Sequence, residues 1–227
     1  MGLSKRTRVP TPGPRELYAL CELLARSPKE EELQVYLQSN PGFLAGLTGT
    51  PDNTDLAVLF KPKIGTQFVA DFCVLQSYQG GSVANLIELE TSDDQLFTKN
   101  GNPARRYATA LKQVEDWRIW IDRNKVHFAK ELVRTAKALP LISAKAPRLK
   151  GIRTTDAARL EKIWAAFGGF DEPFYNYTIV LGRWSRLRGS DKTRIIARNR
   201  NTDRDLTTYT YEQLARQANF RLERDEW

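Results

Sequence analysis

Apolar side chains recur at helical spacing near the start of the chain. Residues 1–14 contain three prolines and no hydrophobic period, which predicts an arm without regular structure. Residues 15–26 carry leucines and alanines every three to four positions, and this spacing predicts a first helix. Ser27 precedes a proline and a run of glutamates, a combination typical of a helix N-cap, so a second helix is predicted over 28–38. Two helices are therefore expected ahead of any strand.

The pattern changes to one typical of β-strands in the next part of the chain. Extended segments are predicted at 56–64, 67–76 and 83–91. The second alternates between apolar and polar positions, so one of its faces is expected to be buried. The third is almost entirely apolar up to Glu88, as in a strand that is covered on both faces. The glycine-rich residues 79–82 predict a hairpin turn between the second and third strands.

Helical spacing returns after the third strand. Within residues 105–123, an apolar stripe predicts a helix that faces the core through Ala110, Val114, Trp117 and Ile121. The other predicted elements are helices at 125–139 and 156–167, a loop at 140–152, strands at 177–181, 194–197 and 206–209, and a last helix from Tyr211 that Thr210 caps. This order predicts an α/β fold of mixed (α+β) type, in which helices flank a central mixed sheet.

Composition limits the class of protein. The 227 residues are 41% hydrophobic, which is enough for a globular domain with its own core. No apolar run approaches the ~18 residues of a membrane span, so we expect no membrane contact. Cys21 and Cys73 lie far apart, which disfavours a disulfide or zinc scaffold and favours a cytoplasmic location. His127 is the sole histidine, so a metal enzyme with this sequence would need carboxylate ligands.

Most of the net excess of positive charge comes from one segment, residues 183–204, which we call the basic strip. The chain has a net charge of +8, and the basic strip alone carries eight basic and two acidic residues. Such a segment is typical of a surface that binds a polyanion, although it also fits a solvated loop and edge strand. Trp184 lies within it and can stack on a base. The predicted nucleic-acid-binding residues are Arg183, Arg186, Arg188, Lys192, Arg194 and Arg198.

Acidic side chains interrupt the predicted strands. Asp71 lies inside the second strand, while Glu88 and Glu90 end the third strand and share one of its faces. A hairpin between these strands would bring Asp71 close to Glu88. Ionised carboxylates are costly at the ends of apolar strands, and a bound Mg²⁺ or Mn²⁺ would offset that cost. Taken singly, each acid also fits a surface role, for instance pairing with Arg105 or Arg106.

Six stretches carry a family resemblance. They are EELQVYLQSNPGFL (31–44), VADFCVL (69–75), LIELETSDDQLFT (86–98), ATALKQVEDWRIWI (108–121), IVLGRWSRL (179–187) and TTYTYEQL (207–214). Together they resemble the nuclease domain of the Shedu antiviral-defence proteins, within the PD-(D/E)xK nuclease superfamily. The resemblance covers residues 28–215. An N-terminal arm with the leading helix (1–27) precedes it, and a helix end with a tail (216–227) follows it.

The resemblance implies a restriction-endonuclease-like core and a set of catalytic residues. Asp71 and Glu88 would be metal-binding acids, and Gln113 would contact the attacking water or an acid of the site. Glu90 stands where the superfamily usually has a lysine. Some restriction endonucleases also carry a glutamate at that position. Glu90 would then accept a proton from the water or join in binding a cation.

The missing lysine leaves the source of positive charge open. Lys99, Arg105 and Lys112 are candidates in the sequence for a cation near the phosphate. Glu31 or Glu32 on the early helix would add an outer carboxylate, although consecutive glutamates also fit a solvated helix face.

The function implied by the resemblance is DNA cleavage. We expect a Mg²⁺- or Mn²⁺-dependent endodeoxyribonuclease that acts on double-stranded DNA in defence against phage or plasmids, and that works as a homo-oligomer. Two alternatives remain open at the level of sequence. One is a nuclease fold that binds nucleic acid without cutting it, and the other is a protein-interaction module with a basic surface.

Overall fold

The structure is a computed structural model that describes residues 12–48, 55–78, 81–138, 173–201 and 205–225. Residues 1–11 of the arm predicted at 1–14, the turn residues 79–80, the loop at 140–152 and the helix at 156–167 lie outside these residues, while Pro14 of the predicted arm belongs to the first helix.

Two helices lead the fold, as the hydrophobic pattern predicted. Helix α1 spans Pro14–Ala25 and α2 spans Glu30–Ser39, followed by the short α3 (Gly42–Ala45) and η1 (Gly46–Thr48). The prediction of Ser27 as the N-cap of α2 was wrong. Ser27 adopts a left-handed φ of +54°, and its backbone N–H donates to the carbonyl of Leu24, so it ends α1 instead. Helix α2 is capped where the N–H of Lys29 donates to Glu32 Oε1 at 3.0 Å.

A five-stranded mixed sheet forms the centre. Its strand order is β1-β4-β5-β6-β7; the pairs β1–β4 and β4–β5 are antiparallel, and β5–β6 and β6–β7 are parallel. The strands are β1 (Asp55–Phe60), β4 (Phe72–Tyr78), β5 (Gly81–Leu89), β6 (Phe174–Val180) and β7 (Leu206–Tyr209). The predicted hairpin between the second and third extended segments is therefore present as β4–β5.

The strands predicted at 56–64 and 67–76 are each divided in two. After β1 the chain takes a left-handed φ of +49° at Lys61 and leaves the main sheet. It forms a small antiparallel hairpin, β2 (Lys63–Ile64) and β3 (Phe68–Val69), and returns to the main sheet at β4. Asp71 consequently lies in the bend before β4 and not inside a strand.

Two of the later helices differ from the prediction. Helix α4 spans Arg105–Ala138 and combines the helices predicted at 105–123 and 125–139, with a kink at Asn124. The strand predicted at 194–197 is wrong, because these residues belong to helix α6 (Gly189–Asn201), which follows the 3₁₀ turn η2 (Trp184–Arg186). Helix α7 spans Tyr211–Asp225, and Thr210 caps it as predicted: the N–H of Gln213 donates to Thr210 Oγ1 at 3.4 Å.

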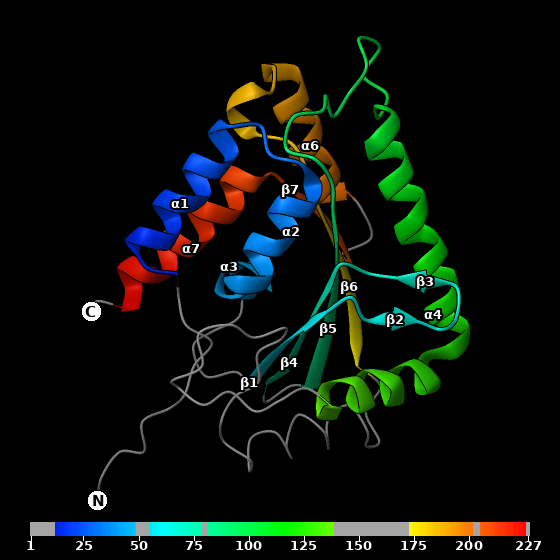
Figure 1. Cartoon of the computed structure of the whole chain (residues 1–227). Helices are drawn as coiled ribbons and strands as arrows, with labels where there is room; N and C mark the ends of the chain where they lie inside the picture. The colour runs from blue at the N-terminus through cyan, green and yellow to red at the C-terminus, as the bar shows by residue number, and fades with distance from the viewer. Residues whose placement is uncertain (1–11, 49–54, 79–80, 139–172, 202–204, 226–227) are drawn as a thin grey trace, which may run out of the picture.

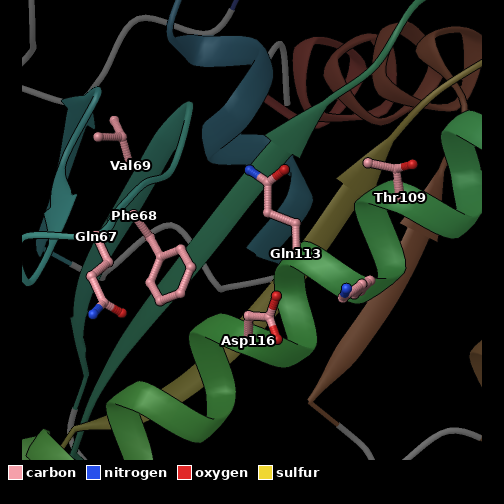
Figure 2. A pocket seen from close by; sticks show the side chains of 7 residues that line it. Gln67, Phe68, Val69, Thr109, Gln113 and Asp116 are labelled. Carbon is pink, nitrogen blue, oxygen red and sulfur yellow. The ribbon is translucent and has the colours of Figure 1, made fainter.

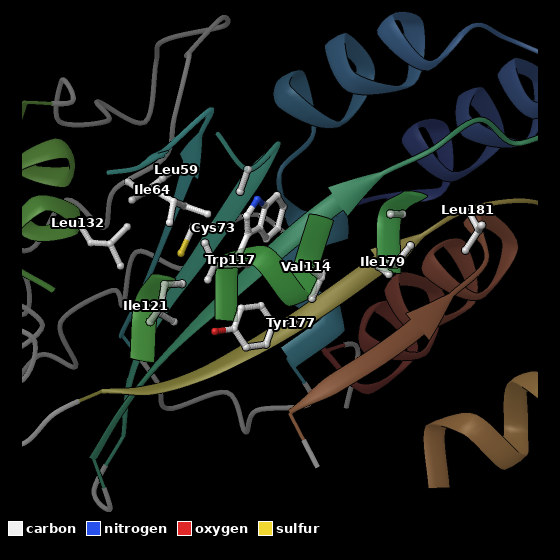
Figure 3. Close-up of a cluster of buried hydrophobic side chains, with 14 of the residues drawn as sticks. Leu59, Ile64, Cys73, Val114, Trp117, Ile121, Leu132, Tyr177, Ile179 and Leu181 are labelled. Carbon is white, nitrogen blue, oxygen red and sulfur yellow. The ribbon is translucent and has the colours of Figure 1, made fainter. Parts of the chain in front are cut away.

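Helices cover both faces of the sheet. Figure 1 shows α4 on one side, and α1, α2 and α7 on the other. On the α4 side, Trp117 is fully buried in a core that also contains Leu86. Figure 3 shows Trp117 near Cys73 in this core. On the opposite side, Ile87 packs in a second core with Tyr211, among other residues. The alternation along β5 confirms a strand that is covered on both faces.

The architecture is a mixed α/β fold that fits a restriction-endonuclease-like α+β core, as predicted. Within the ranges that the structure describes, no helix combines the length and apolar character that crossing a membrane requires.

Candidate functional site

The predicted acids lie at the end of the main sheet where β5 leads into the loop before α4. Asp71 is held against β5 by two backbone hydrogen bonds: its own N–H donates to the carbonyl of Ile87 at 3.1 Å, and the N–H of Leu89 donates to Asp71 Oδ2 at 2.7 Å. Glu88 lies between these two partners on β5, and Glu90 directly follows the strand. The bend before β4 thus places Asp71 beside Glu88.

Glu88 is a buried acid without sufficient partners. Glu88 is only 8% exposed. Within the described ranges, no hydrogen-bond donor contacts its Oε2. Burial, followed by the neighbouring charges of Asp71, Glu90 and Glu30, raises the pKa of Glu88 to about 9. Glu88 therefore holds a proton at neutral pH unless a cation offsets its charge.

Glu90 is less buried and is paired. Burial, followed by the charge of Glu30, raises the pKa of Glu90 to about 7, while Arg106 acts in the opposite direction. Arg106 Nη1 lies 3.7 Å from Glu90 Oε2, and its Nε lies 2.6 Å from Asp94 Oδ2. The surface pairing of Glu90 with Arg106, left open by the sequence, is thus present.

Glu30 is an acid of this cluster that the sequence analysis missed. Its charge raises the pKa of both Glu88 and Glu90, and with Glu90 and Arg106 it lines a pocket of about 460 Å³. Glu31 and Glu32, the predicted outer carboxylates, are both exposed instead. The signal for Glu30 was present in the sequence, because it precedes the buried Leu33 by one helical turn and so lies on the inner face of α2. We call Asp71, Glu88, Glu90 and Glu30 the acid cluster.

Asp71 has two side-chain partners that were also missed. Lys61 Nζ lies 2.5 Å from Asp71 Oδ1, and Gln34 Nε2 of α2 donates to the same oxygen. Lys61 comes from the connection between β1 and β2, and Gln34 comes from helix α2. Among the cations predicted from the sequence, Arg105 lines the pocket of Glu90, whereas Lys112 lines a different pocket and Lys99 is exposed.

Gln113 lies on α4 at a second pocket, of about 410 Å³. Figure 2 shows its amide projecting from α4 into the space between that helix and Phe68 of β3. Thr109, one turn earlier on α4, lines both this pocket and that of Glu90. The two pockets are therefore neighbours along the helix.

The donor chemistry of the acid cluster fits a hard divalent cation, whose preferred ligands are carboxylate oxygens. Oε2 of Glu88, which meets no hydrogen-bond donor among the described residues, is a buried oxygen that a cation would satisfy. Nevertheless, no three acidic, histidine or cysteine side chains in the described ranges are arranged as ligands of one ion. Both oxygens of Asp71 accept hydrogen bonds from protein groups. Cation binding by Asp71, Glu88 and Glu90 stays a prediction.

The basic strip is part loop and part helix, and much of its charge is neutralised within the protein. Arg183 is buried, where it donates to the carbonyl of Leu24 at 2.8 Å and to Asp93 Oδ1 at 3.0 Å. Arg186 also donates to Asp93, at 2.6 Å. The predicted edge strand in this segment is replaced by α6, so its side chains are distributed around a helix.

Other residues of the basic strip are held in a similar way. Arg188 and Arg194 both pair with Asp191, at 2.7 and 2.9 Å. Lys192 Nζ lies 5.4 Å from the centre of the Trp184 ring, and the Arg198 guanidinium lies 5.6 Å from that of Tyr107. Lys192, Arg194 and Arg198 are all partly exposed, which is compatible with contact to a polyanion. The predicted nucleic-acid-binding role of the strip is still a prediction.

The comparison with protein families decides the relationship suggested by the six stretches. The family model described as Shedu protein SduA, C-terminal, matches residues 27–215. The chain belongs to the Shedu family. The match covers most of the chain, including all five strands of the main sheet and every member of the acid cluster. Membership of the Shedu family indicates a role in defence against phage. A comparison with curated proteins gave no match.

Proposed function

We propose that this Shedu-family chain is a metal-dependent nuclease that hydrolyses DNA phosphodiester bonds in defence against phage or plasmids. The observation that carries the proposal is the buried carboxyl group of Glu88, which lacks a donor for Oε2 in the described structure and is surrounded by further carboxylates. A folded protein rarely keeps such a group unless a ligand or a reaction uses it.

Asp71 and Glu88 would hold the cation, which is Mg²⁺ or Mn²⁺. When bound, such a cation would lower the pKa of a water molecule and offset charge on the phosphate. Glu90, with a pKa of about 7, would accept the proton of the attacking water at neutral pH. Gln113 would orient that water through its amide group. Lys192, Arg194 and Arg198 would contact the backbone of double-stranded DNA.

Cleavage of supercoiled plasmid tests the proposal. We expect the wild-type protein with Mg²⁺ or Mn²⁺ to convert the plasmid into nicked or linear forms, and chelation by EDTA to stop it. Asp71→Asn keeps the hydrogen bond from Leu89 but removes the charge, so we expect at least a 100-fold lower rate, on the order of the loss of one transition-state contact. Glu115→Gln removes an exposed carboxylate on α4 and is the matched control. Equal cleavage by the wild type and Asp71→Asn would contradict the proposal.

A second candidate function is DNA binding without cleavage. It is favoured by the pairing of Asp71 with Lys61 and of Glu90 with Arg106, which satisfies these acids without a cation. In the same assay, this candidate predicts an intact plasmid with both metals and a shifted plasmid band on a native gel. The two functions therefore give different results in one experiment.

A further inference from the structure

We propose that Lys61 supplies the positive charge that acts beside Asp71 and Glu88 on the phosphate during hydrolysis. This inference rests on the proposed nuclease function and assigns a role within it. Glu90, which directly follows β5, stands where the family resemblance would place a lysine. Lys61 brings an ammonium group to the same acids from a different connection of the fold.

The backbone fixes Lys61 beside Asp71. The backbone N–H of Lys61 donates to the carbonyl of Asp71 at 2.9 Å, and its Nζ lies 2.5 Å from Asp71 Oδ1. Two contacts thus join the same two residues, one through the main chain and one through the side chains. The left-handed φ of +49° at Lys61 turns the chain out of β1 at this point. The position of the ammonium group is therefore built into the place where the chain leaves the main sheet.

The exposed side chain of Lys61 and its effect on neighbouring charges suit a group that contacts a substrate. Its side chain is 42% exposed, whereas that of Asp71 is 7% exposed. One side of the ammonium group can thus contact Asp71 while another faces solvent. Its charge also extends beyond Asp71, since it lowers the pKa of both Glu88 and Glu30. Lys61 accordingly acts on three members of the acid cluster, namely Asp71, Glu88 and Glu30.

Two other basic side chains near the acid cluster lie beside residues other than Asp71 in the described structure. Arg106 Nη1 lies 3.7 Å from Glu90 Oε2, and Arg106 Nε lies 2.6 Å from Asp94 Oδ2. The positive charge of Arg106 therefore pairs with Glu90 and Asp94. Lys112 lines the neighbouring pocket with Gln113. Across the residues for which ion pairs are described, the salt bridge to Asp71 comes from Lys61.

The reaction gives this charge a defined task. The water oxygen forms a bond to phosphorus, the bond from phosphorus to the leaving sugar oxygen breaks, the water proton passes to Glu90, and the leaving oxygen takes a proton from solvent. Negative charge on the phosphoryl oxygens is redistributed in the transition state, where a fixed ammonium group stabilises it more than bulk water does. Lys61 keeps its proton throughout.

The variant Lys61→Gln separates charge from structure, because glutamine can still donate a hydrogen bond to Asp71. We expect the cleavage rate at saturating Mn²⁺ to fall about 100-fold, as for the loss of one electrostatic contact to a transition state. DNA affinity and melting temperature are expected to stay close to those of the wild type. Calorimetric Mn²⁺ affinity without DNA should be unchanged or tighter, because an ammonium group no longer competes at Asp71.

Lys63→Gln is the matched control, since Lys63 is an exposed lysine of β2 two residues further along the chain. We expect it to cleave at the wild-type rate. Cleavage by Lys61→Gln within threefold of wild type would overturn the assignment of Lys61, and if Asp71→Asn were inactive in the same assay, the proposed function would stand. Weaker Mn²⁺ binding by Lys61→Gln would also overturn it, because Lys61 would then only hold Asp71 in place.

A wild-type protein that leaves DNA intact with both metals would remove the proposed function and the role of Lys61 together. Should Lys61→Gln fail to fold, Lys61→Met carries the same comparison. Its folding is checked by circular dichroism before any rate is measured.

Discussion

At the scale of single residues, burial decides which carboxyl groups carry charge. Glu88 is almost completely buried, and its pKa of about 9 means that it is protonated at neutral pH in the cation-free protein. Asp71 lies beside it with Lys61 and Gln34 as partners. The acid cluster thus has one member that is paired within the protein and another that needs a proton or an external cation.

The raised pKa of Glu88 predicts how stability depends on pH. The folded state binds this proton more tightly than the unfolded chain, whose glutamates have a pKa near 4.5. Its contribution to stability is therefore full below pH ~4.5 and is lost as the pH rises toward about 9; Glu90 acts in the same direction up to about 7. Between pH 6 and 8.5 we expect the cation-free wild type to lose on the order of 1–3 kcal/mol relative to Glu88→Gln.

Urea unfolding of both proteins in the presence of EDTA measures this difference. Curves of unfolding free energy against pH that run parallel for the wild type and Glu88→Gln would contradict the assignment of Glu88 as a buried, protonated acid.

The sequence allowed prediction of three members of the acid cluster and not of their surroundings. Asp71, Glu88 and Glu90 stand out because ionisable residues in or beside apolar strands are costly. Lys61 comes from a β-connection, where charged residues are common and carry no such signal. For Glu30, the helical spacing from Leu33 indicates only that it lies on the inner face of α2. Their proximity to the acids results from tertiary packing, which one sequence does not reveal.

At the scale of elements, the predictions failed where a short apolar run was too brief to show its period. Residues 194–197 were predicted as a strand, yet Ile195 is buried and Ile196 is 42% exposed, as expected for neighbours on one helix. Over so few residues, one buried and one exposed neighbour fit a strand as well as a helix. Longer patterns were informative: the apolar stripe on α4 and the apolar run in β5 both lie where the sequence predicted them.

The β2–β3 hairpin depends on a glycine that the close approach of α4 requires. Gly65 adopts a φ of +63°, and a Cβ atom there would lie 2.5 Å from Trp120 Cζ2. We expect Gly65→Ala to lower the free energy of unfolding by about 1–3 kcal/mol, because it adds backbone strain and a clash. Chemical denaturation measures the change.

Gly189→Ala is the control for this prediction, since Gly189 begins α6 and a Cβ atom there has open space around it. A loss of stability at Gly189 as large as that at Gly65 would show that the contact with Trp120 is not the cause.

At the scale of the whole molecule, the sheet brings distant parts of the chain to one end. The residues of the acid cluster come from α2, from the bend before β4, and from β5 and the residue after it. Arg106 of α4 pairs with Glu90 of this cluster. Two cores, one on each face of the sheet, hold these elements in place. The net charge of +8 adds a general attraction to polyanions.

Binding to double-stranded DNA is therefore expected to weaken steeply with salt. Lys192→Gln should reduce the slope of log affinity against log salt by about one, the effect of one lost phosphate contact. Lys130→Gln removes an exposed lysine of α4 outside the basic strip and should leave the slope unchanged. Fluorescence anisotropy over a salt series measures both. Negligible DNA affinity at ~0.1 M salt would instead favour a protein-interaction module.

The most direct measurement is the anomalous diffraction of a crystal soaked in Mn²⁺. The account predicts a strong peak at the end of β5, between about 2.0 and 2.6 Å from carboxylate oxygens of both Asp71 and Glu88. It also predicts that the peak is absent in a soaked crystal of Glu88→Gln. A wild-type crystal that shows no peak at these acids, with Asp71 still bound to Lys61 at saturating Mn²⁺, would contradict it.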